Sequence, residues 1–178
     1  MSEVVPKSEI ELRAIEERDA EFIFKWASHP EITRHTLGRR FPMQKRSIRE
    51  WIDSSNVGEF PTRVAYLIVD KTPVGLVQLD QIDWVAKNAW LGVWVIPEAQ
   101  KVGRGSLAVN SLLDFAAQTL GLRQIRLLVR KDNQNAIAIY ERIGFHQEGE
   151  LVDAEYRDGM FQSLILMCIY LSQGKKAN

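Results

Sequence analysis

Two glycines and two cations stand close together in residues 100–106, which read QKVGRGS. An apolar, strand-like run ends at Pro97, just before them, and a run with helical spacing follows them. Glycine lets the backbone approach a ligand closely, and the first amides of a helix lack carbonyl partners and carry partial positive charge. The segment therefore predicts an anion-binding loop, in which Lys101 and Arg104 add side-chain charge.

Three phosphate-bearing ligands compete for this loop. A nucleoside triphosphate site needs the pattern GxxxxGK[ST]. The sequence lacks this pattern, and such a site is therefore excluded. A dinucleotide site fits Gly103-x-Gly105-x-x-Ala108 formally, but the stretch 96–102 is too long for its tight turn, and no acidic residue closes strand 123–130 to hold a ribose. The third ligand is coenzyme A.

Composition limits the class of protein. The chain has 178 residues with 23 Lys+Arg and 23 Asp+Glu, so no global charge draws it to nucleic acid or to an acidic membrane. We expect one domain, at 8–171. We also expect a cytoplasmic location, because no leader is evident and no apolar run approaches the roughly 18 residues that span a bilayer. Cys168 stands alone in an apolar run and is expected in the core, and no cluster has metal-ligand spacing.

Hydrophobic spacing predicts the elements that must position the loop. They are a strand at 9–15, helices at 19–28 and 47–55, strands at 64–70, 72–83 and 88–96, a helix at 106–120, a strand at 123–130, a helix at 134–143, and two last strands with a turn at 157–159. Strands 88–96 and 123–130, joined by a helix, should be parallel, and the others mostly antiparallel. The predicted class is α+β with a mixed sheet.

Two segments resemble signatures of one family. Residues 100–105 match Q/R-x-x-G-x-G/A, and residues 133–145 (NQNAIAIYERIGF) match N-x-x-A-x-x-x-Y-x-x-x-G-F, both typical of the GNAT superfamily of acetyl-CoA-dependent N-acetyltransferases. The segment 24–32 (FKWASHPEI) resembles the branch that acetylates ribosomal-protein N-termini and amino-sugar nucleotides. The resemblance implies the GNAT fold and acetyl-CoA as cosubstrate.

The resemblance also implies which residues hold acetyl-CoA. The diphosphate would lie on the amides of 102–106, and the pantetheine arm would lie between splayed strands beside 93–95. The implied set is Val93, Val95, Gln100, Lys101, Val102, Gly103, Arg104, Gly105, Ser106, Asn133 and Tyr140. From the residues alone, Asn133 is equally well a helix cap, and Tyr140 a core tyrosine.

The implied reaction is direct transfer, in which a neutral amine attacks the thioester carbonyl and backbone amides stabilise the oxyanion. By the resemblance, Tyr140 is the general acid to the leaving thiolate. Many family members carry a glutamate near the positions that hold Ala89 and Trp90 here, and this chain has none there. Asp80 and Asp83 are the candidate bases, and both also fit solvated carboxylates.

The acceptor is expected beside the first two helices. Between Glu31 and Arg49 there are six Lys/Arg residues. They are either a solvated face or a site for an anionic acceptor, in which case an amino-sugar nucleotide comes first, a protein N-terminus second, and a polyamine low. The residues that carry this expectation are Arg34, Arg39, Arg40, Lys45 and Arg46. Four tryptophans either line the acceptor cleft or belong to the core: Trp26, Trp84, Trp90 and Trp94.

Two alternatives stay open at this point. The domain could be a non-catalytic CoA-binding sensor that kept the phosphate loop, or a nicotinamide-dependent oxidoreductase. A homodimer is a further expectation, and the apolar last run, 163–171, is either core or its interface. The expected partner is an amine acceptor, either a small molecule or a peptide.

Overall fold

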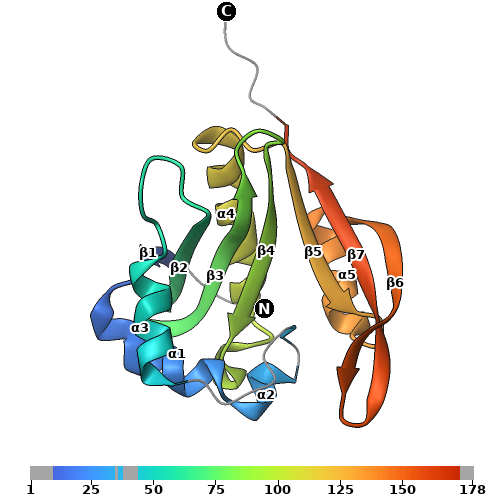
Figure 1. The fold of residues 1–178 in the computed structure, drawn as a ribbon, viewed down its shortest axis with the longest axis horizontal. Helices are drawn as coiled ribbons and strands as arrows, with labels where there is room; N and C mark the ends of the chain where they lie inside the picture. The colour runs from blue at the N-terminus through green and yellow to red at the C-terminus, as the bar shows by residue number, and fades with distance from the viewer. Residues whose placement is uncertain (1–9, 35, 38–43, 173–178) are drawn as a thin grey trace, which may run out of the picture.

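The computed structural model describes residues 10–34, 36–37 and 44–172. Figure 1 shows a curved sheet with helices packed against it. The elements in chain order are β1 (Glu11–Ala14), a 3-10 turn (Glu17–Asp19), α1 (Ala20–Ala27), α2 (Pro30–Thr33), α3 (Lys45–Asp53), β2 (Arg63–Asp70), β3 (Thr72–Asp83), β4 (Asn88–Val95), a second 3-10 turn (Pro97–Ala99), α4 (Arg104–Gln118), β5 (Gln124–Arg130), α5 (Gln134–Ile143), β6 (His146–Arg157) and β7 (Met160–Tyr170).

The sheet has seven strands in the order β1-β2-β3-β4-β5-β7-β6. Only β4 and β5 pair in parallel among the strands described, and the α4 crossover connects them. Their pairing runs from Asn88↔Gln124 to Trp90↔Arg126 and goes no further, while β4 stays paired with β3 as far as Val95. The two strands therefore separate beyond Trp90, as Figure 1 shows, and this divergence is confirmed.

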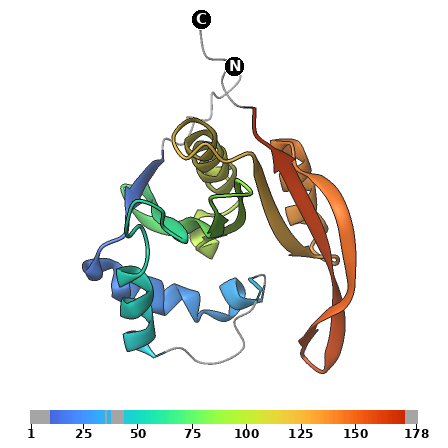
Figure 2. The same ribbon diagram turned by 45° about the horizontal axis from the view of Figure 1, so that its top comes forward.

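Two apolar clusters pack on the two faces of the sheet. One places α4 against the sheet through side chains such as Val109 and Leu112, with the apolar face of α5 beside it. The other packs α1, α2 and α3 on the opposite face, where Trp94 of β4 joins them. Alternating strand residues supply the two clusters, as Leu76 and Val77 do in β3. Figure 2 shows the helices on either side of the sheet.

The α+β class with a mixed sheet, the predicted order of strands and longer helices, and the parallel β4–β5 pair are confirmed. The turn between β6 and β7 also lies where Asp158 and Gly159 predict it, with positive φ at both residues. Two helix starts were expected too late, because α3 begins at Lys45 and α4 at Arg104. The short helix α2 was not expected, since a single turn is too short to show hydrophobic periodicity.

Candidate functional site

A cavity of about 430 Å³ opens at the place where β4 and β5 separate. The cavity brings together residues from α1, α2, β3, β4, β5 and α5. Its lining comprises Ala27, Ile32, Thr36, Leu37, Leu76, Gln78, Asp80, Gln81, Trp90, Leu91, Gly92, Val93, Trp94, Leu128 and Tyr140. Of the residues that the sequence singled out, Asp80, Trp90, Val93, Trp94 and Tyr140 therefore share one space.

The loop before α4 has the backbone form that anion binding needs. Lys101 and Gly103 have φ values of 67° and 84°, and Gly103 is the N-cap residue of α4. Such a left-handed turn ahead of a helix gathers amides into a concave surface for an anion. At Gly103 the positive φ accounts for the choice of glycine.

Space beside the start of α4 accounts for the second glycine. A Cβ atom on Gly105 would lie 3.5 Å from Cγ2 of Val95, which is ordinary van der Waals contact. Packing within the protein therefore does not demand glycine at this position. A bare backbone here leaves room for a ligand to approach the first turn of the helix.

Two polar side chains of the loop bind the protein itself. Gln100 donates its side-chain amide to the carbonyl of Val95 at 2.8 Å. Arg104 forms an ion pair with Asp70 at the end of β2, with Nε 2.6 Å from the carboxylate, and also donates to the carbonyl of Ala99 at 3.3 Å. These contacts brace the loop against the sheet. Much of the charge of Arg104 is thus balanced by Asp70.

Tyr140 extends from α5 into the cavity beyond the end of the β4–β5 pairing. Its ring packs edge-on against Phe145, with the centroids 5.7 Å apart. Burial raises the pKa of the Tyr140 phenol to about 12, so the hydroxyl stays protonated at neutral pH. A protonated phenol lining a cavity is a chemically competent proton donor.

Asn133 is a helix cap, which is one of the two roles that the sequence predicted for it. It is the N-cap residue of α5, and its side-chain oxygen accepts a hydrogen bond from the amide of Ala136 at 3.2 Å. The side-chain NH₂ group of an asparagine with this role still has two hydrogens to donate. The cap therefore leaves the proposed contact with pantetheine chemically open.

Asp80 lies at the cavity wall on β3, where Arg63 of β2 holds its carboxylate. Arg63 donates to the two carboxylate oxygens at 3.1 and 3.2 Å, and the amide of Gln81 donates to one of them at 2.9 Å. The other candidate base, Asp83, accepts from the amides of a turn, at Val85 and Ala86, and is outside the cavity lining.

The tryptophans divide between the cavity and the core. Trp90 and Trp94 line the cavity. Trp26 belongs to α1 and is buried in the apolar cluster that this helix forms with the sheet. Trp84 packs against Phe60, and its indole donates to the carbonyl of Pro61.

The structure describes only part of the segment 31–49, which carries six Lys/Arg residues. Lys45 pairs with Glu21, and Arg46 with Glu50, both on exposed surface. Arg34 lines a second cavity, of about 290 Å³, beside the N-terminus of α5. Arg39 and Arg40 lie outside the described residues.

Several residues that line the cavity were not predicted from the sequence. Gln78 and Gln81 lie in the second half of β3, where polar and apolar residues alternate or mix, and that polar character was their only local signal. Thr36, Leu37 and Leu128 carry no signal in sequence, because distant elements bring them to the cavity.

Other sequence expectations concern metals, membranes and the thiol. Within the described ranges, no group of three or more His, Cys, Asp or Glu could hold a metal ion. No helix in that part of the chain is long and apolar enough to cross a membrane. Cys168 is buried as expected, with Sγ 3.2 Å from Nε2 of His146, and burial raises the pKa of its thiol.

Known proteins resemble this chain in sequence and in structure. The family model described as acetyltransferase (GNAT) domain matches residues 9–146. Spermidine N(1)-acetyltransferase of Escherichia coli (strain K12) is 27% identical over 164 residues, which cover 92% of this chain and 87% of that protein. The putative ribosomal N-acetyltransferase YdaF of Bacillus subtilis (strain 168) is 31% identical over 101 residues, covering 57% and 55%.

A solved structure extends the likeness to the fold. The crystal structure of spermidine N-acetyltransferase from Vibrio cholerae in complex with CoA and spermine has a TM-score of 0.85 and 26% identity, and the match covers 93% of this chain and 98% of that one. With the family match, the splayed strands and the loop before α4, this establishes that the chain belongs to the GNAT family and is an acetyl-CoA-dependent N-acetyltransferase.

Proposed function

We propose that the enzyme acetylates the primary amine of a small molecule that binds in the 430 Å³ cavity. One observation carries this proposal: Tyr140, Asp80 and the β4 residues Gly92–Trp94 all line the same space, next to the gap between β4 and β5. A proton donor, a β4 backbone segment beside the gap and a carboxylate are what direct transfer to an amine requires.

The residues of the loop and of β4 would hold acetyl-CoA. The amides at Val102–Ser106 suit its diphosphate, because they combine a helix start with a left-handed turn at Gly103. Val93 and Val95 flank the gap into which the pantetheine arm would pass, and exposed Lys101 adds positive charge at its entrance. Gln100 and Arg104 would act by shaping the loop.

The proposed reaction has two steps. The amine nitrogen forms a bond to the thioester carbon, and the carbonyl oxygen takes negative charge that β4 amides near Val93 stabilise. The C–S bond then breaks, and Tyr140 gives its proton to the thiolate. Asp80 receives the proton of the attacking amine through water, because its carboxylate is already held by Arg63.

The charge of the cavity favours an acceptor with a single ammonium group. Among the described lining residues Asp80 is the only carboxylate, and Arg63 balances it. Binding several ammonium groups needs several unpaired carboxylates. Gln78, Gln81 and the two tryptophans instead suit an uncharged, partly apolar body, such as that of an amino sugar.

A polyamine is the second candidate, and the relatives favour it. Both the Escherichia coli protein and the Vibrio cholerae structure are named spermidine acetyltransferases. The Lys and Arg residues at 31–49 argue against a polyamine acceptor, and this argument therefore has to be tested. Two further acceptor classes rank lower. They are an amino-sugar nucleotide, with its diphosphate beside Arg34, and a protein N-terminus.

The test is a comparison of kcat/KM for acetyl transfer, with spermidine, spermine, amino sugars, amino-sugar nucleotides and peptides with free N-termini. We expect the largest value for an amine with one positive charge. A larger value for spermidine or spermine would replace this acceptor class with polyamines. Binding of acetyl-CoA without transfer to any amine would instead support the sensor alternative.

Two further expectations stay predictions. The cytoplasm is the expected location. The run 163–171 that was expected as core or dimer interface lies mostly in the core, with Leu164, Ile165, Met167 and Cys168 buried. The homodimer is therefore proposed through the exposed large apolar side chains of β6 and the start of β7: Leu151, Val152, Tyr156, Met160 and Phe161.

A further inference from the structure

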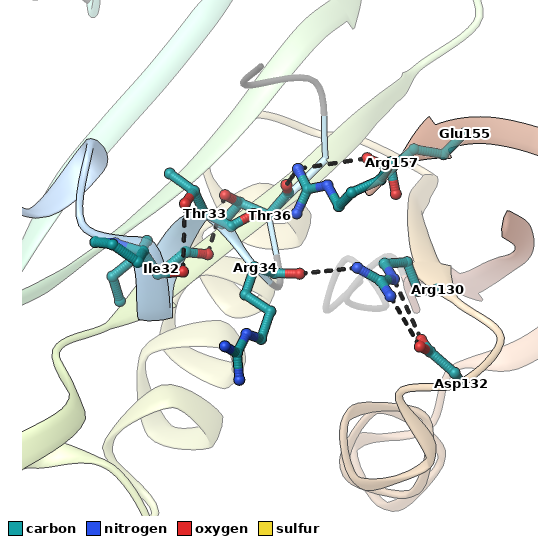
Figure 3. Close-up of polar contacts among 9 residues, drawn as sticks. Ile32, Thr33, Arg34, Thr36, Arg130, Asp132, Glu155 and Arg157 are labelled. Carbon is teal, nitrogen blue, oxygen red and sulfur yellow. Dashed lines mark hydrogen bonds and ion pairs between the residues drawn. The ribbon is translucent and has the colours of Figure 1, made fainter. Parts of the chain in front are cut away.

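Two arginines of the C-terminal half of the sheet bind the end of α2. Arg157 of β6 donates to the carbonyls of Thr33 and Thr36, the latter at 3.3 Å. Arg130 of β5 donates to the carbonyl of Arg34 at 3.1 Å. Figure 3 shows both guanidinium groups pointing at the same short segment. We call these two arginines and the three carbonyls the clasp.

The end of α2 needs such partners. The last carbonyls of a helix have no amide donors within the helix, and they carry partial negative charge. With four residues, α2 ends almost as soon as it begins. Two guanidinium groups supply both the missing donors and the complementary charge.

Each guanidinium is paired with an acid two residues away. Asp132 binds Arg130 through two hydrogen bonds, at 3.2 and 2.8 Å. Glu155 lies with Oε1 3.6 Å from Nη2 of Arg157 and is only 3% exposed. Among the residues that the structure describes, neither carboxylate oxygen of Glu155 has a hydrogen-bond partner. A buried carboxylate with no hydrogen bond depends on the nearest cation, so Glu155 and Arg157 fix each other in place.

The clasp lies across the divergence of the sheet. β4 and β5 are joined only through residues 88–90 and 124–126. The clasp ties α2, which packs on the β1–β4 half, to β5 and β6 of the other half. The segment it holds supplies Ile32, Thr36 and Leu37 to the cavity lining.

We propose that Arg157, supported by Arg130, is a positioning residue that holds the wall of the acceptor cavity formed by Ile32, Thr36 and Leu37, and thereby sets acceptor affinity. This inference rests on the proposed use of that cavity by the acceptor. Arg157 itself is absent from the lining, so it acts through the backbone that it binds.

The test compares Arg157→Lys with wild type. Lysine keeps a cation beside Glu155 but lacks the planar fork that reaches two carbonyls. We expect the acceptor KM to rise about tenfold. We expect kcat and the acetyl-CoA KM to stay within about twofold, because the clasp touches neither Tyr140 nor the loop before α4. The amides of Thr33, Arg34 and Thr36 should exchange hydrogen faster.

Two further variants sharpen the test. Arg126→Lys is the matched control, since Arg126 also joins β5 to β6, through Glu148 at 3.1 Å, without touching α2. It should leave both the acceptor KM and the exchange unchanged. The double variant Glu155→Gln with Arg157→Gln removes the buried charges together, and should reproduce the effects of Arg157→Lys if that variant folds poorly.

The outcomes separate the clasp from the proposed function. Wild-type exchange rates at the end of α2 in the Arg157 variants would overturn the clasp, whatever the enzyme acetylates. Faster exchange with an unchanged acceptor KM would overturn its role in acceptor binding. If wild type acetylates no amine, the proposed function fails, and the exchange comparison alone then decides on the clasp.

Discussion

Arg63 holds the carboxylate of Asp80 through two hydrogen bonds, at 3.1 and 3.2 Å, on the wall of the 430 Å³ cavity. The Arg63 guanidinium in turn lies over the ring of Trp51, 5.5 Å from its centroid. Asp80 thus has a fixed orientation, and its side chain is 28% exposed, so water can still reach it. A carboxylate in that state can relay a proton through water.

Asp80→Asn tests this relay. Asparagine keeps a similar shape but cannot accept the proton, so we expect kcat/KM for the amine to fall by about a hundredfold. Steady-state kinetics against pH would measure it. Asp83→Asn is the control, because Asp83 caps a turn outside the cavity. Equal, small effects of the two substitutions would remove Asp80 from the mechanism.

Tyr140→Phe should lower kcat by about a hundredfold, because the thiolate would leave without a proton donor. The KM for acetyl-CoA should change little, since the ring is kept. Tyr66→Phe removes another partly buried phenol, one that packs on Phe115 and is absent from the cavity lining, and should leave kcat unchanged. Unchanged turnover in Tyr140→Phe would assign Tyr140 to packing alone.

The pKa of Tyr140 makes a separate prediction. Burial raises this pKa from 10.0 to about 12, so the phenol remains the acid form across the working pH range. Its ionisation should not limit kcat below about pH 11. The stability that the neutral phenol provides should be complete below pH 10 and should be lost as pH rises through 12. Ultraviolet titration should show a late phenolate step that Tyr140→Phe lacks.

Gly103→Ala tests the phosphate loop. Alanine is strained at a φ of 84°, so the loop should shift and the KM for acetyl-CoA should rise, by about tenfold. Gly58→Ala is a close control, with the same φ of 84° and similarly open surroundings. It should lower stability to a similar extent without changing acetyl-CoA binding. Matching KM values in the two variants would contradict the assignment of the loop.

The exposed apolar side chains of β6 and β7 predict self-association. Val152 and Phe161 are 72% and 63% exposed, and burying them against a second copy would be favourable. Replacing both with Ser should reduce the mass measured by light scattering to that of a monomer. A wild-type protein that is already monomeric at high concentration would disprove the homodimer.

Local patterns in the sequence predicted most of the fold and part of the site. The loop before α4 and the helix that carries Tyr140 were predictable, because their chemistry lies in neighbouring residues. Arg104 with Asp70 is a contact across 34 positions, and Arg157 with Thr33 spans 124. Such pairs follow from the folded sheet and leave no local trace. The same holds for the residues that distant elements bring to the wall of the 430 Å³ cavity.

The separation of β4 and β5 also bears on aggregation. Strand edges with open backbone groups normally invite pairing with other chains, and in most sheets they lie on the outer rim. Here the outer strands are β1 and β6, while the opened edges face each other inside the sheet. Because the strands converge again at Trp90, a foreign strand meets a closed end there. The protein can thus keep bare backbone at its centre without offering a template for fibril growth.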